Sequence, residues 1–195
     1  MGRPNISDTR IEEILEAFEH CVIQKGFDKT TLGDIAEKSG MPRSLVRYFI
    51  GNRADLESKL VDRVLDRVEK KFTAIPACPV QPSPALLVSF VISEVFDDQL
   101  LNQLVRELWR LGMRSESLHS RITNMYQRVL NDLNQQFASS TESSDASLTE
   151  AEVFGIFSLG LGMTVMAEFG LHPKSKTEFA LKALGQISTQ STTQK

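Results

Sequence analysis

The sequence predicts an all-α protein of about nine helices, and three observations lead to that fold class. Apolar residues recur at spacings of three and four along most of the chain, whereas alternation with a period of two is almost absent. Gly26, Gly40 and the prolines of 76–84 fall between the apolar stripes, where helices begin and end. The 195 residues, of which 41% are hydrophobic, can bury a core without disulfides or metal.

The first two predicted helices both end near glycines. An apolar stripe from Ile11 to Val22 predicts a helix that ends near Gly26. Thr31 can cap the second helix through its hydroxyl, and Asp34 at the third position suits the positive end of the helix dipole. This second helix has barely two turns.

The third and fourth helices follow after short turns. Pro42 suits a first helical position, so we expect the third helix to run from there to about Ile50. The fourth helix spans about 53–72, with an apolar stripe that starts at Leu56.

A proline-rich joint separates these helices from the rest of the chain. Four prolines lie within 76–84 and cannot continue a helix. Five further helical patterns follow, at about 84–96, 98–113, 116–138, 148–169 and 175–188. We therefore expect an N-terminal three-helix domain, 1–52, and a second domain, 53–195, made of the connecting helix and a C-terminal helical bundle.

Composition predicts a cytoplasmic protein that does not enter a membrane. The first ten residues lack the apolar core of a signal peptide, and the most apolar segment, 153–169, is short and interrupted by glycines. Cys21 and Cys78 do not form a disulfide framework, which favours a reducing compartment.

The second and third helices, joined around Gly40, match the helix-turn-helix arrangement that binds DNA. If Val46, Phe49 and Ile50 point inward, then Arg43, Ser44, Arg47 and Tyr48 face outward. With the cap of the second helix and the start of the fourth, the candidate DNA-binding residues are Thr31, Arg43, Ser44, Leu45, Arg47, Tyr48 and Arg53.

Charge segregation supports this interpretation, although the net charge of the chain is −3. From Lys38 to Arg53 there are four basic residues and no acidic one, while the first helix carries several glutamates. Arginine can pair with guanine edges or with phosphate, which suits Arg47 and Arg53 respectively. For an isolated arginine pair a solvated surface would be the simpler explanation, but the short helices and the charge pattern together favour DNA.

A string of motif residues runs through the same segment: Ile14, Ala17–Phe18, Gly26–Phe27, Thr30–Thr31–Leu32, Ile35–Ala36, Ser39–Gly40–Met41, Tyr48–Phe49, Asn52–Arg53 and Leu56. In these, the first 56 residues resemble the tetracycline-repressor (TetR-like) family of bacterial regulators. Family members usually have Tyr at the position of Arg47, Lys at that of Arg53 and a small polar residue at that of Pro42. Arg47 therefore predicts a base preference of its own.

The resemblance implies a homodimeric, ligand-responsive transcriptional repressor that binds a palindromic DNA operator and is released by a small-molecule effector. It places the dimer interface on the last two long helices, where the candidates are Phe154, Leu161, Val165, Ala180, Ala183, Leu184 and Ile187. Core packing within one subunit explains the same apolar pattern equally well.

An effector pocket is also implied, and apolar, aromatic and isolated polar residues of the C-terminal helices are the candidates for its lining. These are Phe90, Glu94, Trp109, Met113, Met125, Tyr126 and Phe157. Packing in the core is the alternative for each of them.

No catalytic constellation is recognisable. The three histidines are scattered, and no nucleophile elbow, phosphate loop or dinucleotide fingerprint occurs, so we expect no enzyme activity, no cofactor and no metal. The alternative function is a helical small-ligand-binding or interaction protein without DNA binding. Activation in place of repression remains open.

Overall fold

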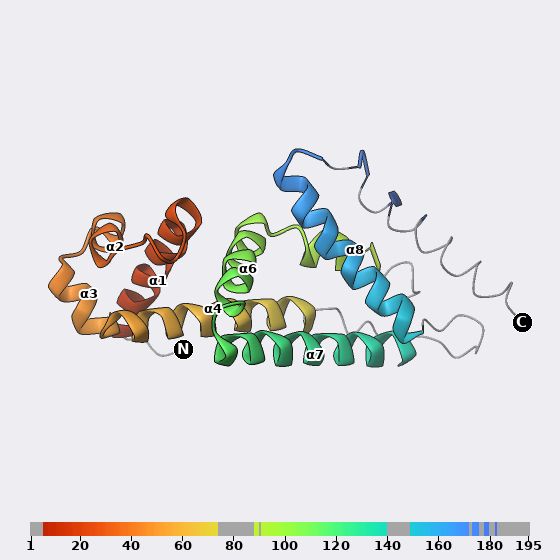
Figure 1. Ribbon diagram of the computed structural model, residues 1–195, viewed down its shortest axis with the longest axis horizontal. Coiled ribbons are helices and arrows are strands. Elements are labelled where there is room, and N and C mark those ends of the chain that lie inside the picture. Colours follow the sequence, from red (N-terminus) through yellow and green to blue (C-terminus); the bar gives the residue numbers. More distant parts are fainter. Residues whose placement is uncertain are drawn as a thin grey trace, which may run out of the picture. The chain divides into compact units, whose positions relative to one another are not determined.

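The computed structural model describes residues 6–73, 88–89, 91–139, 149–171, 173–175, 178–179 and 182. Every regular element among them is helical, which confirms the predicted all-α class. The elements are α1 (Ile6–Lys25), α2 (Leu32–Ser39), α3 (Arg43–Ile50), α4 (Arg53–Thr73), η1 (Val91–Val95), α6 (Gln99–Gly112), α7 (Glu116–Ser139) and α8 (Glu150–Glu168) (Figure 1).

Two predicted helices fall only partly on described residues. Within 84–96, the described part includes η1, a single π-helical turn. Within 175–188, the helical residues described are 178–179 and 182. The proline-rich stretch 76–84 lies outside the described residues.

Helix α3 begins one residue later than the sequence predicted, so Pro42 precedes its first helical residue. Helix α3 begins at Arg43, and Pro42 is its N-cap with an extended ψ of 143°. The Pro42 carbonyl accepts the amides of Leu45 and Val46, so the proline still starts the helix, but from outside its first turn.

The chain divides into two compact units. Unit 1 comprises Met1–Arg67 and Gln103–Ser120, and unit 2 comprises Val68–Asn102 and Arg121–Lys195. Helices α4, α6 and α7 each contribute residues to both units. The division into functional domains after residue 52 stays a prediction.

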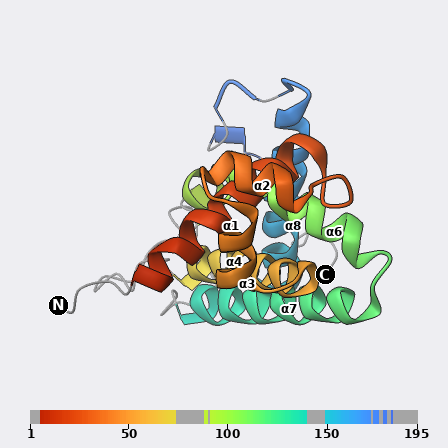
Figure 2. The ribbon, with the colours of Figure 1, turned by 90° about the vertical axis from the view of Figure 1, so that its left-hand side faces the viewer.

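Unit 1 is held by the apolar faces of its helices. The ring of Phe18 on α1 is fully buried and meets Phe27 edge to face, with centroids 5.6 Å apart. Ile35 of α2, Val46 of α3 and Leu60 of α4 are also buried. Helices α1, α2 and α3 contact one another, and Figure 2 shows the three together.

A buried ion cluster joins α1 to α4 within unit 1. The carboxylate of Glu19 is 3% exposed, and it lies 2.8 Å from Nε of Arg63 and 3.0 Å from Nη1 of Arg67. Arg63 also pairs with Glu12. Burial alone would lower the pKa of Arg63, but its hydrogen bonds to Glu12 and Glu19 outweigh burial and raise that pKa.

Aromatic rings form the centre of unit 2. Phe72 of α4, Phe96 after η1 and Phe157 of α8 are in mutual contact, with centroids 5.6–5.9 Å apart. The ring of Tyr126 on α7 meets Phe157 edge to face at 5.6 Å. Gly160 of α8 allows Phe96 to lie against the helix backbone, since a methyl group there would be 3.0 Å from the ring Cζ and still closer to two other ring atoms.

We predict that Gly160→Ala destabilises the protein by about 1–3 kcal/mol, because the added methyl group displaces the packed Phe96 ring. The matched control is Gly162→Ala, two residues along the same helix, where no atom lies within 4 Å of the added carbon. There the better helix propensity of alanine should stabilise by about 0.5–1 kcal/mol. Urea unfolding at one protein concentration measures both, and equal effects would contradict the close packing of Phe96.

Candidate nucleic-acid interface

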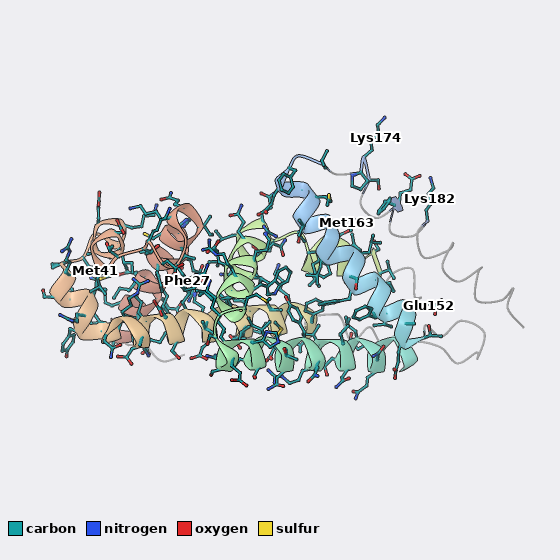
Figure 3. All side chains as sticks on the ribbon, in the orientation of Figure 1. Phe27, Met41, Glu152, Met163, Lys174 and Lys182 are labelled. Atoms are coloured by element: carbon teal, nitrogen blue, oxygen red, sulfur yellow. The ribbon has the colours of Figure 1, made fainter. Side chains whose placement is uncertain are left out.

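The helix α2 is capped at both ends. At its start, the Thr31 hydroxyl accepts the amide of Asp34, and the Asp34 carboxylate accepts the amide and the hydroxyl of Thr31. At its end, Gly40 adopts a left-handed conformation with φ of 67°, and the amide of Met41 donates to the Ala36 carbonyl at 3.0 Å. The Met41 side chain is buried in the turn that leads to α3, where Figure 3 labels it. The caps therefore determine where α3 begins.

Helix α3 presents one buried and one exposed face. Val46 and Ile50 are buried, and Phe49 is half-buried. The exposed face consists of Arg43, Ser44, Leu45, Arg47 and Tyr48. These are five of the seven residues that the sequence nominated for DNA, and the structure brings them together on one short helix.

The two arginines of α3 differ from the others in their surroundings. Arg43 and Arg47 make no ion pair and no side-chain hydrogen bond within the part of the chain that the structure describes, whereas every other arginine described there has at least one interaction partner. Unpaired guanidinium groups on an exposed face are suited to an external anion.

The two remaining candidates are engaged inside the protein. The hydroxyl of Thr31 belongs to the cap of α2. The guanidinium of Arg53 donates to the carbonyls of Thr30 and of Phe27, the latter at 2.7 Å, and pairs with Glu57 at 2.7 Å. Sequence reasoning missed these contacts because the two carbonyls belong to a loop more than 20 residues away. The role of Arg53 at DNA stays a prediction.

The described candidates for the effector pocket are divided between the two units, and their role in a pocket stays a prediction. Phe90 lies outside the described residues. Trp109 is half-buried and Met113 is 79% exposed, and both belong to unit 1. The other four belong to unit 2: Glu94 exposed on η1, Met125 buried, Tyr126 half-buried and Phe157 buried. Of these, Tyr126 and Phe157 are in direct contact.

An apolar groove of about 450 Å³ occurs elsewhere, on α8 and the segment that follows it. Its lining consists of Ser158, Leu159, Gly162, Met163, Met166, Leu171, Pro173 and Phe179. Figure 3 labels Met163, which projects from α8. The sequence signal for this groove was the pair of methionines three residues apart, which sequence reasoning did not use.

Three of the dimer candidates share a face of α8. Phe154 is 59% exposed, and Leu161 and Val165, seven and eleven residues further on, are half-buried. Ala180, Ala183, Leu184 and Ile187 lie outside the described residues. Among the described helices, α8 alone has the length and hydropathy of a membrane span, a property that core helices of soluble proteins share.

Comparison with known proteins finds partial similarity to two HTH-type transcriptional regulators. No family model matches the chain. It is 26% identical over 96 residues to the HTH-type transcriptional regulator TtgR of Pseudomonas putida, which is 49% of this chain and 45% of that protein. It is 38% identical over 50 residues to the probable HTH-type transcriptional regulator ArpR of Pseudomonas putida, 26% of this chain and 24% of that protein. The matches thus span less than half the length of these curated relatives.

Solved structures share the fold over nearly the whole chain. A TetR transcription regulator from Haloarcula marismortui superposes with a TM-score of 0.70 at 16% identity, covering 94% of this chain and 98% of that one. The resemblance to TetR-like regulators, first inferred from the N-terminal 56 residues, is therefore confirmed at the level of the fold.

We predict that the Asp34 carboxylate stabilises the folded protein at pH values above 3.8, which is the ordinary pKa of an aspartate. This stabilisation is lost as the pH falls toward 2. The hydrogen bond from Lys25 at 2.5 Å, and those from Thr31, lower the pKa of Asp34 to about 2, so the folded state favours the ionised form. The difference in Tm between the wild type and Asp34→Asn should be constant above pH 3.8 and should shrink below it.

The variant Lys25→Ala tests the cause of that shift. It removes the strongest partner of Asp34, so the carboxyl should titrate at a higher pH when followed by carbon-13 NMR. A titration curve identical to that of the wild type would show that Lys25 does not lower the pKa.

Proposed function

We propose that this chain is a DNA-binding transcriptional regulator, a repressor of the TetR-like type that binds a palindromic operator as a homodimer and is released by a small molecule. The observation that carries the proposal is the exposed face of α3, where Arg43 and Arg47 have no partner among the described residues. The relatives named as HTH-type transcriptional regulators support it.

The residues of the exposed face divide by the chemistry they offer. Arg47 has the planar fork that pairs with the edge of a guanine in the major groove. Ser44 and Tyr48 carry hydroxyls that can donate to phosphate oxygens, and Leu45 offers an apolar contact to a thymine methyl. Thr31 at the start of α2 and Arg53 at the start of α4 border this face in the sequence, and we assign them to the DNA backbone.

Release by an effector would be a shift between two populations of the dimer. A ligand that binds more tightly to one arrangement of the two subunits raises the population of that arrangement. In the ligand-bound arrangement the two α3 helices no longer match two successive major grooves, so the operator is released. Helix α4 is the candidate for transmission, because its residues belong to both units. We assign the effector to unit 2, where the Tyr126–Phe157 contact and the α8 groove are the candidate sites.

A helical ligand-binding protein without affinity for DNA is the alternative. The α8 groove would serve it equally well, but such a protein has no use for two uncompensated arginines on a short exposed helix. The named relatives are regulators, which does not favour an enzyme. A regulator of this type works in the cytoplasm.

We predict that Arg47→Ala weakens binding to the operator by about 1–3 kcal/mol and relaxes its sequence preference, because a base contact is lost. The operator is first selected from random duplex DNA, and affinities for it and for a scrambled duplex are then compared. Arg47→Lys is the matched control, since it keeps the charge but loses the planar fork. An unchanged ratio of specific to non-specific affinity in Arg47→Ala would remove this residue from base recognition.

We further predict that Phe154→Asp converts the dimer to monomers, because it places a charge in the apolar face of α8 in both subunits. The folded monomer should tolerate the change, since the side chain is 59% exposed. Sedimentation velocity measures the mass. Met113→Asp, at another exposed apolar residue, should leave the dimer intact, and a dimeric Phe154→Asp would exclude this face as the interface.

A further inference from the structure

Gly33 lies inside a helix although its backbone does not require a glycine. It is the second residue of α2, and the described glycines with positive φ are Gly26, Gly40, Gly51 and Gly170. A glycine within a helix costs stability relative to alanine. The reason for a glycine at position 33 is therefore the space that a side chain there would fill.

The guanidinium of Arg43 fills that space. A methyl group on Gly33 would lie 2.9 Å from Cζ and 3.1 Å from Nε of Arg43, and closer still to one of its terminal nitrogens. The three nearest atoms all belong to this guanidinium, so a side chain at position 33 and the present position of Arg43 exclude each other. The contact joins the first turn of α2 to the first residue of α3.

The first turn of α2 is a favourable place for a phosphate contact. In the first turn of α2 the amide of Asp34 donates to the capping hydroxyl of Thr31, which leaves the amides of Leu32 and Gly33 without an acceptor in the helix, and the first helix of a helix-turn-helix crosses the DNA backbone. The neighbouring acid Asp34 does not neutralise Arg43, because its two carboxylate oxygens accept from Lys25 and from Thr31. A guanidinium on this turn therefore adds an uncompensated, forked donor to first-turn amides.

We propose that Gly33 is a positioning residue: it leaves room for the guanidinium of Arg43 to lie on α2, where Arg43 binds a backbone phosphate, and base recognition on α3 is left to Arg47. The two arginines of one helix then have different tasks, although both are exposed and stand one turn apart. This inference rests on the proposed function, since it names the part of the DNA that Arg43 contacts.

The experiment begins with the full-length wild type and random duplex DNA. Recovery of a preferred sequence supports the proposed function, and failure to recover one would refute that function before Gly33 is tested. The affinities of the wild type, Gly33→Ala, Arg43→Ala and the double variant are then measured for the selected duplex and for a scrambled one, over a range of salt concentrations.

We expect Arg43→Ala to weaken binding to both duplexes by the same factor and to reduce the slope of log K against log salt by about 0.9, the value for one phosphate contact. Its selected sequence should equal that of the wild type. Gly33→Ala should reduce the slope in the same way, because its methyl group displaces the guanidinium. In the Arg43→Ala background, Gly33→Ala should have no further effect.

Two controls separate the contact from general effects. Thermal unfolding should show Gly33→Ala to be at least as stable as the wild type, because alanine favours the helix and the displaced atoms are the end of a flexible side chain. Arg128→Ala, which removes one positive charge in unit 2, should leave the salt slope unchanged.

The proposal is overturned by any of three results. A changed base preference in Arg43→Ala would show that Arg43 reads the sequence directly. Additive effects of the two substitutions would show that Gly33 does not act through Arg43. An unaltered salt slope in Gly33→Ala would show that the phosphate contact does not need the guanidinium of Arg43 to lie against Gly33.

Discussion

A buried carboxylate must be paired with cations, and in unit 1 this requirement holds α4 against α1. Glu19 pairs with both Arg63 and Arg67, so separating the two helices would break both ion pairs of this carboxylate. At the start of the same helix, Arg53 is bonded to the loop between α1 and α2. Only two residues connect α3 to α4. The direction in which α3 presents its exposed face therefore depends on polar contacts that α4 makes elsewhere.

Local signals in the sequence predicted the helices of unit 1 to within a few residues. The apolar period, the Thr31 cap and the left-handed Gly40 act over one or two turns, and no distant residue is needed to see them. The hydrogen bonds of Arg53 and the packing of the Arg43 guanidinium against Gly33 could not be predicted from such local signals. Both join residues that the chain brings together only by folding, and an exposed arginine has the same pattern in the sequence whether it is paired or not.

The apolar candidates for the pocket and for the dimer interface show the limit of residue type as a signal. Phe154 and Phe157 lie on one helix, three residues apart, yet the first is 59% and the second 4% exposed. Met113 and Met125 differ as widely. A large apolar side chain can serve a core, a groove or an interface, and only the phase of each helix against its neighbours decides between them. That phase is a tertiary property, which the residue type alone does not reveal.

The surroundings of Arg43 and Arg47 have a consequence for selectivity. Where a surface arginine is paired, an incoming anion must compete with a carboxylate of the protein itself; on α3, as far as the described residues extend, it needs only to displace water. Any flexible polyanion, including cellular RNA or a heparin matrix, meets the same low barrier at this helix. Attraction by charge therefore cannot tell one polymer from another, and under the proposed function discrimination rests on how closely a duplex groove fits the exposed face of α3.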